Sequence, residues 1–393
     1  MSKGKFGVAI LGCGGISGAH IRAYQQFPDE CEIRAVCDIN EAAAKRRSEE
    51  CGGVKIYLDY REALQDRSID IVSIPTPHYL HAPMTIAAAK AGKHILVEKP
   101  MAMTVGEAHE MIETARKHGV KLAVIFGRRT QPANRFIKER VIPLLGEIRF
   151  SYLNGFHWRG TDYYASGAWR GTWKYEGGGV FINQAVHGWD LYQWLLGGVD
   201  YAYGYWTNIM HPTIEVEDLG YGLIRFKNGS HGKLLTTSIC KSPDGLAGIY
   251  IQGEKGEVRD TSFTLTDKSL EAELKEEMRR YVERPMLTGH AMQVKDLMDA
   301  IREDREPYVD GVSAMESLKM INGIHWHGWR FASDFRDWVY DNYADDLPKP
   351  SRQGGPIMPE DAQEQDWRGG RLIQDLEAIV TDESTTLEAP FLS

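Results

Sequence analysis

The feature that most constrains this 393-residue chain is the regular alternation of short apolar segments and longer helical ones over its first 128 residues. The short segments are rich in Val and Ile, almost continuously apolar and too short for helices, which is typical of parallel strands covered on both faces. They lie at 6–11, 32–37, 69–74, 94–97 and 121–126. Helical stretches such as 84–91 and 105–118 separate them. The alternation predicts a doubly wound α/β sheet.

A glycine-rich segment, Gly12-Cys13-Gly14-Gly15-Ile16-Ser17, joins the first apolar run to the first helix. Glycines there let the chain turn tightly and approach a pyrophosphate, whose charge is met by the helix N-terminus. Asp38 ends the next apolar run, 21 residues after Ser17. A carboxylate at that place accepts hydrogen bonds from the ribose 2′-hydroxyl and repels a 2′-phosphate. We therefore predict a Rossmann domain over 1–128 that binds NAD rather than NADP; a purely structural strand–turn–helix is the alternative. The predicted contacts are Gly12, Gly14, Gly15, Ile16 and Asp38.

Two polar motifs, Pro75-Thr76-Pro77-His78 and Glu98-Lys99-Pro100, follow two of the later apolar runs. Open α/β sheets bind ligands at the carboxyl ends of their strands, which is where both motifs lie. A lysine there can hydrogen-bond a substrate hydroxyl and stabilise the oxyanion as the proton leaves. A nearby positive nicotinamide ring would lower its pKa. A polar strand end before a proline turn would look the same, so the motif alone leaves both interpretations open.

From residue 129 the pattern changes to alternating, aromatic-rich segments between 147 and 265. One of them, 220–226, is followed by the turn signal Lys227-Asn228-Gly229-Ser230. We predict a second α/β domain over 129–333, with an open, mainly antiparallel sheet and one helix over 180–196 before most of its strands. Helical periodicity returns at 290–303 and 313–332.

A third cluster is the glycine run Gly177-Gly178-Gly179 leading into the helix predicted over 180–196. Asn183 and His187 are four residues apart on that helix, so they would share a face. Asp190, three residues after His187, could orient the imidazole or only solvate it. A histidine packed in the core would give the same pattern, so this cluster by itself does not decide.

Taken together and in this order, the three clusters resemble the glucose–fructose oxidoreductase / inositol dehydrogenase / MocA (Gfo/Idh/MocA) family. The resemblance runs from residue 5 to about 332 and includes Trp169-Arg170-Gly171-Thr172-Trp173, a segment of one branch of the family. It implies NAD(P)-dependent oxidation, with Lys99 at the hydride-transfer centre and His187 as the acid/base group. Many members carry Asp where this chain has Asn183, and an amide cannot act as a base. The further cofactor contacts that the motifs imply are Pro75, Thr76, Pro77, His81, Glu98 and Lys99.

The predicted substrate surface is rich in tryptophan, because six of the ten tryptophans lie between residues 158 and 206. Flat aromatic rings stack on the C–H faces of pyranose rings, while cationic and amide groups bind the hydroxyls. Trp189 and Trp194 are expected in the core. The residues predicted to line the pocket are Trp158, Arg159, Trp169, Arg170, Trp173 and Asn183, with His157 and Arg128 as further candidates.

These observations predict an NAD-dependent dehydrogenase that oxidises a secondary ring hydroxyl of a sugar, glycoside or cyclitol, such as C3 of a glucoside. His187, near its ordinary pKa, would take the hydroxyl proton while Lys99 stabilises the alkoxide. Two alternatives stay open: a glycoside-cleaving relative with tightly bound NAD, and a non-catalytic NAD(H)-sensing subunit. A sensor would need neither Lys99 nor His187, which speaks against the second.

Residues 334–393 form a predicted acidic, Pro-containing extension, since 341–393 hold twelve acidic and four basic side chains. It would be a solvated tail or an arm around a neighbouring subunit, with Trp338, Trp367 and Phe391 as anchors. The family resemblance implies a homo-oligomer, a dimer or tetramer, formed through the second sheet. The net charge of −9 argues against nucleic-acid or anionic-membrane partners. Scattered cysteines, no apolar run of about 18 residues and no leader pattern predict a cytoplasmic protein without a membrane span. No metal site is expected.

Overall fold

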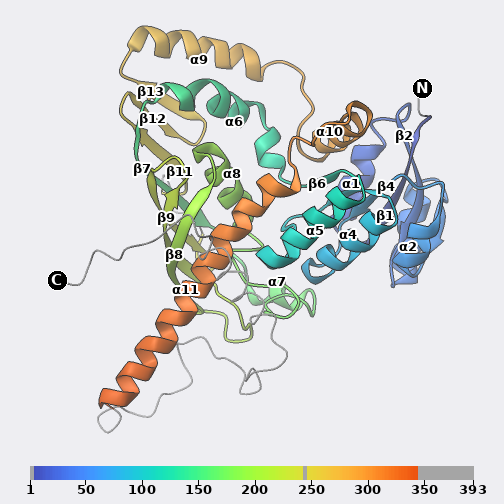
Figure 1. Ribbon diagram of the computed structural model, residues 1–393, viewed down its shortest axis with the longest axis horizontal. Helices are drawn as coiled ribbons and strands as arrows, with labels where there is room; N and C mark the ends of the chain where they lie inside the picture. The colour runs from blue at the N-terminus through green and yellow to red at the C-terminus, as the bar shows by residue number, and fades with distance from the viewer. Residues whose placement is uncertain (1–3, 242–245, 344–393) are drawn as a thin grey trace.

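The computed structural model describes residues 4–241 and 246–343, which form two sheets flanked by helices (Figure 1). The N-terminal sheet has six parallel strands in the order β3-β2-β1-β4-β5-β6. Its strands are β1 (Phe6–Leu11), β2 (Cys31–Cys37), β3 (Lys55–Tyr57), β4 (Ile71–Ile74), β5 (His94–Val97) and β6 (Leu122–Val124). The intervening helices are α1 (Ser17–Tyr24), α2 (Glu41–Glu50), α3 (Tyr60–Gln65), α4 (His81–Lys90) and α5 (Val105–Lys117). The predicted Rossmann fold is confirmed, while the short β3 and α3 escaped the sequence patterns.

The C-terminal sheet has seven strands in the order β13-β12-β11-β7-β10-β9-β8. Only the β7–β10 pair is parallel, so the predicted mainly antiparallel sheet is confirmed. The strands are β7 (Ile148–Phe156), β8 (Val199–Thr207), β9 (Leu219–Phe226), β10 (His231–Thr237), β11 (Gly248–Gly253), β12 (Gly256–Arg259) and β13 (Ser262–Leu265). Burial alternates along β9 and β10, as expected for a sheet with one face in the core. The turn at Lys227–Ser230 connects these two strands as predicted.

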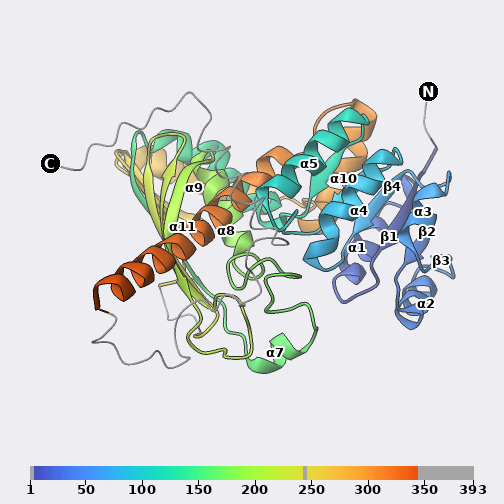
Figure 2. The same cartoon turned by 60° about the horizontal axis from the view of Figure 1, so that its bottom comes forward.

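The helices of the C-terminal half are α6 (Pro132–Phe136), α7 (Thr161–Ala165), α8 (Val186–Leu196), α9 (Lys268–Val282), α10 (Gly289–Glu303) and α11 (Gly311–Tyr343). The long α11 contacts β8, α5 and α8, and Figure 2 shows it running obliquely along the sheet toward the Rossmann domain. It passes without a break through residue 334, where the sequence places the start of the extension. Residues 344–393, with the proposed arm, lie outside the described part of the chain.

The helix predicted over 180–196 is six residues shorter, since α8 begins at Val186. Gly177 and Gly178, which precede the predicted start, have φ values of +82° and +147°, so the chain enters this segment from a non-helical turn. The Glu217 carboxylate accepts hydrogen bonds from the backbone N–H groups of Gly179 and Phe181 at 2.8 and 3.0 Å. These amides are therefore satisfied by a side chain from another segment, and Asn183 lies in turns that precede the helix.

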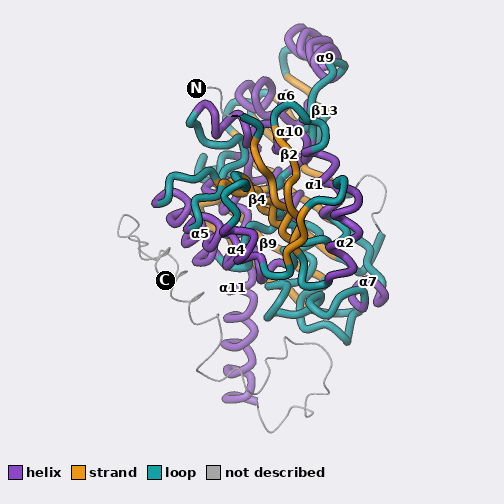
Figure 3. Tube along the Cα trace, turned by 90° about the vertical axis from the view of Figure 1, so that its right-hand side faces the viewer, coloured by secondary structure: helices purple, strands orange, loops and turns teal. Residues whose placement is uncertain are grey.

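Helix α10 belongs by packing to the first domain, although its sequence lies far into the second. It contacts α1, as Figure 3 also shows from the side of the Rossmann domain. Its residues Val294, Leu297 and Met298 are buried in the same hydrophobic cluster as Val8 and Ile10 of β1. The C-terminal chain thus completes the core of the N-terminal sheet.

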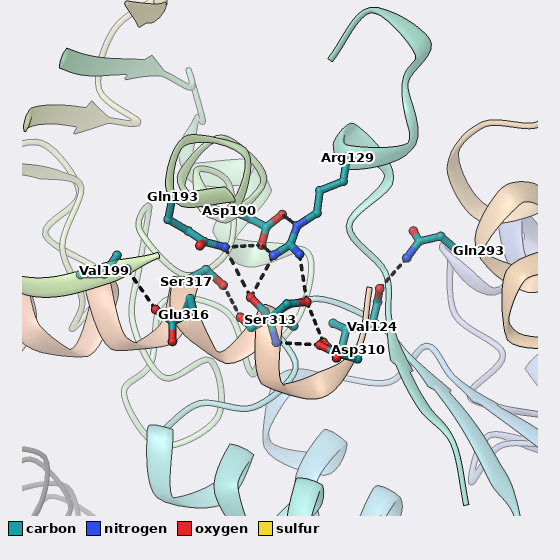
Figure 4. A network of polar contacts seen from close by, with 11 residues as sticks. Val124, Arg129, Asp190, Gln193, Val199, Gln293, Asp310, Ser313, Glu316 and Ser317 are labelled. Carbon is teal, nitrogen blue, oxygen red and sulfur yellow. Dashed lines mark hydrogen bonds and ion pairs between the residues drawn. The ribbon is translucent and has the colours of Figure 1, made fainter. Parts of the chain in front are cut away.

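A buried ion pair ties the two halves together (Figure 4). Arg129 donates through Nε to Asp190 Oδ2 at 2.7 Å and through Nη2 to the Ser313 carbonyl at 3.0 Å, linking the turn 127–130, α8 and α11. Arg129 and Asp190 are both fully buried. The carboxylate of Asp190 is therefore engaged by Arg129, which corrects the expectation that it could orient or solvate His187. Among the described helices, none is both long and apolar enough to cross a membrane.

Candidate active site

The glycine loop after β1 leaves one side open for a ligand. Gly12 has φ +120°, and a Cβ there would lie 2.9 Å from Thr76 Cγ2, so only glycine fits against the strand end of β4. Cβ atoms at Gly14 and Gly15 would meet no described atom within 4 Å. Ser17, at the third position of the glycine pattern, is buried and donates to the Gly14 carbonyl at 2.6 Å. The loop is therefore fixed from within and free on its outer side.

Asp38 lies directly beside this loop. Its carboxylate accepts hydrogen bonds from the backbone N–H groups of Cys13 at 2.7 Å and Asn40 at 2.8 Å. Two arginines of α2 reach the same loop: Arg46 donates to the Cys13 carbonyl at 3.3 Å and Arg47 to the Gly14 carbonyl at 3.0 Å. Asp38, which the sequence predicts to bind the ribose, thus lies beside a loop that also binds two arginines of α2, which the sequence spacing did not place there.

The strand ends of β4 and β5 are joined by His81. One ring nitrogen lies 2.9 Å from the Thr76 carbonyl and the other 2.7 Å from the Pro100 carbonyl. The buried Thr76 Oγ1 has no hydrogen-bond partner among the described residues. An open glycine edge, a carboxylate at the loop and an orphaned hydroxyl facing it are what a dinucleotide requires, so these residues fit NAD.

Glu98 is buried between two histidines from distant parts of the chain. Its Oε1 is 3.1 Å from His20 Nε2 of α1 and 3.0 Å from His290 Nε2 of α10, and its Oε2 accepts from the Lys99 backbone N–H. Although burial acts to raise it, these hydrogen bonds hold the pKa of Glu98 well below its ordinary value. The ligand atoms of His20, Glu98 and His290 lie within 4.8 Å of one another and could hold a metal ion, so the expectation of no metal stays a prediction.

Lys99, at the end of β5, extends toward the turns before α8. Its Nζ donates to the Asn183 carbonyl at 3.1 Å. Burial lowers the pKa of Lys99, while the carboxylates of Glu98 and Glu176 oppose this shift. A lysine with a lowered pKa in this crevice can both donate to a substrate hydroxyl and, as the free amine, accept its proton.

His187 lies in the first turn of α8, edge-on to the Phe126 ring with centroids 6.2 Å apart. Burial, followed by the charge of Lys99, lowers the pKa of His187 to about 3. The expectation of an imidazole near its ordinary pKa is therefore wrong. The physical reason is that the ring is desolvated next to an ammonium group, and both effects disfavour a second positive charge.

Asn183 does not share a helix with His187 but is held by two side chains that the sequence reading missed. Its Nδ2 donates to the Tyr163 hydroxyl at 3.1 Å and to Glu176 Oε1. Glu176 is fully buried, and this burial raises its pKa to about 7. Its position directly before the glycine run was a signal that could have found it, whereas nothing in the sequence pattern identifies Tyr163.

Aromatic and cationic side chains surround this group. The Arg170 guanidinium lies over the rings of Tyr163 and Trp169, at 4.4 and 4.5 Å from their centroids. Trp169 also faces His78, with ring centroids 4.9 Å apart. The Arg159 guanidinium also lies over the Tyr163 ring, 4.9 Å from its centroid. Aromatic rings next to guanidinium donors are well suited to bind a polyhydroxylated sugar ring.

The remaining predicted pocket residues separate into two groups. Burial, with the charges of Arg128 and Arg159, lowers the pKa of His157 to about 4, so these three side chains lie close together. Trp158 is 44 % exposed. Trp173 instead packs against Trp206 and His325, with centroids 5.2 and 5.1 Å away, and donates to the Glu215 carbonyl. The contacts of Trp173 are those of a structural residue, which corrects its assignment to the pocket.

Comparison with known proteins places the chain in a family. Residues 6–126 match the model of the oxidoreductase family with an NAD-binding Rossmann fold, and residues 138–325 match the model of that family's C-terminal α/β domain. The chain belongs to this Gfo/Idh/MocA oxidoreductase family, and its N-terminal domain is the family's NAD-binding domain.

Individual relatives cover part of the chain. A D-glucoside 3-dehydrogenase of Escherichia coli (strain K12) is 29 % identical over 245 residues, 58 % of this chain and 69 % of that enzyme. An alpha-N-acetylgalactosaminidase of Shewanella oneidensis is 29 % identical over 180 residues, 42 % of this chain and 39 % of that protein. A crystal structure of the WlbA dehydrogenase from Bordetella pertussis with NADH and UDP-GlcNAcA has a TM-score of 0.75 and 28 % identity, covering 84 % of this chain and 97 % of that one. The matches span 39 to 78 % of the lengths of such curated relatives.

Proposed function

We propose that this protein is an NAD-dependent dehydrogenase that oxidises a secondary ring hydroxyl of a sugar, glycoside or cyclitol, such as the C3 hydroxyl of a glucoside. The observation that carries the proposal is the position of Lys99. Lys99 lies at the end of β5, at the same edge of the sheet as the glycine loop after β1. Its amino group donates to the Asn183 carbonyl at 3.1 Å and is close enough to His187 to lower the pKa of that residue. The group that would transfer a proton thus meets the cofactor side and the substrate side at one point.

Lys99 and His187 take different parts in the proposed reaction. At neutral pH the His187 imidazole is uncharged, because its pKa is about 3, and it orients the substrate hydroxyl through a ring nitrogen. Burial lowers the pKa of Lys99, so its amine gives up its proton more readily than that of an ordinary lysine and can act as a base. In its unprotonated form, which the lowered pKa makes more accessible, the Lys99 amine takes the hydroxyl proton, and the O–H electron pair forms the new carbonyl bond. NAD, when bound, supplies the acceptor for the hydride of the carbinol carbon.

The substrate class follows from the groups around that point. Trp169 and Tyr163 offer ring faces, and the Arg170 guanidinium beside them offers donors for hydroxyls. The buried Gln184 Oε1 has no hydrogen-bond partner among the described residues, and a substrate hydroxyl would satisfy it. The similarity to a D-glucoside 3-dehydrogenase supports a glucoside as the first substrate to try.

A second candidate function is the cleavage of a glycosidic bond with NAD retained, which the partial similarity to an alpha-N-acetylgalactosaminidase favours. NADH formation by the purified protein, with NAD and NADP in parallel, distinguishes the two. The panel contains glucose, galactose, simple glucosides and myo-inositol, together with nitrophenyl glycosides. Accumulating NADH supports the dehydrogenase, whereas aglycone release without NADH overturns it in favour of cleavage. Bound nicotinamide without either reaction would leave the NAD(H)-sensing role.

We also propose that the outer face of the C-terminal sheet pairs with a second copy of the chain. Large apolar side chains at alternate positions of β8 and β9 are 40 to 49 % exposed on this face; they are Tyr201, Tyr203, Tyr205, Tyr221 and Leu223. Exposed patches of this kind mark interaction surfaces. Sedimentation of the wild type and of Tyr221→Lys tests the proposal: a dimer or tetramer that dissociates in the variant supports it, and a monomeric wild type overturns it.

A further inference from the structure

A second carboxylate beside Lys99, besides that of Glu98, comes from a residue that no motif marked. Glu176 is fully buried immediately before the glycine run. Its Oε1 accepts a hydrogen bond from Asn183 Nδ2 and its Oε2 accepts one from the Gly171 backbone N–H. Its own carbonyl lies 2.8 Å from His78 Nδ1. Both carboxylate oxygens and the backbone carbonyl are thus fixed by hydrogen bonds, which offset part of the cost of burying an acid.

The contacts of Asn183 connect this carboxylate to Lys99. The side chain of Asn183 is held by Glu176, while the backbone carbonyl of the same residue accepts the hydrogen bond from Lys99 Nζ at 3.1 Å. A shift of the Asn183 turn would therefore move the acceptor that orients the lysine. The link also has an electrostatic part, because Glu176 opposes the fall in the pKa of Lys99.

We propose that Glu176 is a positioning residue of the reaction, which sets the orientation of Lys99 through Asn183. This inference rests on the proposed function of Lys99. Glu176 makes no contact with the substrate in this role. It determines where the amine of Lys99 lies and how strongly that amine holds its proton.

The ionisation of Glu176 falls in the working range of pH. Burial raises its pKa to about 7 against the hydrogen bonds from Gly171 and Asn183. The charged groups that act on it are Lys99, Arg170 and Glu217, and the ionisable Tyr163 and Tyr164 lie beside it. We expect the ionised form to hold Asn183, so activity rises as the pH passes through the pKa of Glu176.

The experiment exchanges the acceptor and the donor of the hydrogen bond between Glu176 and Asn183. Glu176→Gln leaves an amide facing two N–H donors, and we expect kcat to fall about tenfold to hundredfold, with the pH limb near 7 lost and the affinity for NAD unchanged. Asn183→Asp alone brings two carboxyl groups together and should also lower kcat. The double variant Glu176→Gln/Asn183→Asp restores a donor–acceptor pair of reversed polarity and should recover most of the loss. Asp162→Asn, which removes an exposed carboxylate of α7, is the matched control.

Three outcomes overturn the inference: full activity in Glu176→Gln, a pH limb near 7 that persists in it, or a double variant whose loss is the sum of the two single losses. A measurement that does not depend on turnover separates this inference from the proposed function. Between pH 4.5 and 7 the folded protein keeps a proton on Glu176 that the unfolded chain loses, so the wild-type stability should fall as pH rises through this window. Glu176→Gln should remove that slope. If stability falls with rising pH as expected but no sugar is turned over, the proposed function is contradicted, whereas the ionisation of the buried Glu176 is confirmed.

Discussion

The proposed cofactor side of the site is assembled from strand ends, whereas the proposed substrate side is assembled from turns. The loop after β1 and the ends of β4 and β5 are fixed by parallel pairing along buried strands. Asn183 and Glu176, by contrast, lie in non-helical segments before α8 and are hydrogen-bonded to each other, with Tyr163 as a further partner of Asn183. The backbone between them is held by the carboxylate of Glu217. Short, continuous motifs are enough to specify the first side. The second depends on partners that are scattered along the chain.

This difference has consequences for mutation. Substitutions at strand ends should change chemistry and leave the fold intact, because the strands are held by backbone pairing over their whole length. Substitutions in the buried polar network should change the fold as well, since a lost partner leaves a buried group unsatisfied. The four predictions below test this contrast.

The largest effect is expected from Lys99→Met. Loss of the amine should lower kcat by about a thousandfold or more, because it removes both the proton acceptor and the donor that stabilises the alkoxide. NAD affinity, measured by fluorescence titration, should change little, since the glycine loop and Asp38 are untouched. Turnover near the wild-type rate would remove Lys99 from the reaction.

Arg129→Met should destabilise the protein by about 3–5 kcal/mol, because it leaves the fully buried Asp190 without its partner. Denaturant unfolding gives this quantity directly. The matched control is Arg135→Met, which removes an ion pair to Glu139 on a more exposed helix face and should cost under about 1 kcal/mol. Equal losses in the two variants would contradict the role of the buried pair in joining the two halves.

His187→Ala should lower kcat by roughly a hundredfold, as expected when an orienting group is lost. Because burial beside Lys99 lowers the pKa of His187 to about 3, the imidazole is neutral over the whole range from pH 5 to 9. The shape of the pH–rate profile should therefore be unchanged. Disappearance of a limb between pH 6 and 7 in this variant would show that the histidine titrates after all and would return the proton transfer to it.

The smallest effect is expected at the cofactor loop. Asp38→Asn removes the charge that repels a 2′-phosphate, while Arg46 and Arg47 stay bonded to the loop carbonyls. We expect the ratio of kcat/KM for NAD to that for NADP to fall by about tenfold, the equivalent of roughly 1.4 kcal/mol. Glu41→Gln, an exposed change on α2, the helix that carries Arg46 and Arg47, is the control and should leave the ratio unaltered. An unchanged ratio for Asp38→Asn would remove this carboxylate from ribose recognition.

Where the sequence predictions failed, long-range contacts had replaced local periodicity. The helix expected over 180–196 begins only at Val186, and the turns before it are held by Glu217 from a distant segment, which binds the backbone N–H groups of Gly179 and Phe181. Asp190 was expected to interact with His187, three residues away, but it pairs with Arg129. The four-residue spacing failed because Asn183 lies outside the helix, whereas the three-residue spacing failed within α8 because a distant arginine binds the carboxylate.

The sequence by itself determined the Rossmann fold, the glycine loop, the strand ends that carry Thr76 and Lys99, and the mainly antiparallel second sheet. These features arise from interactions between residues close in the chain: apolar runs, glycine turns and strand–helix alternation. The tertiary structure alone decided that α10 completes the core of the first domain, that His290 lies within hydrogen-bond distance of Glu98, and that Glu176 accepts a hydrogen bond from Asn183. These contacts join residues that no local pattern links, and burial of polar groups away from water is what makes each of them specific.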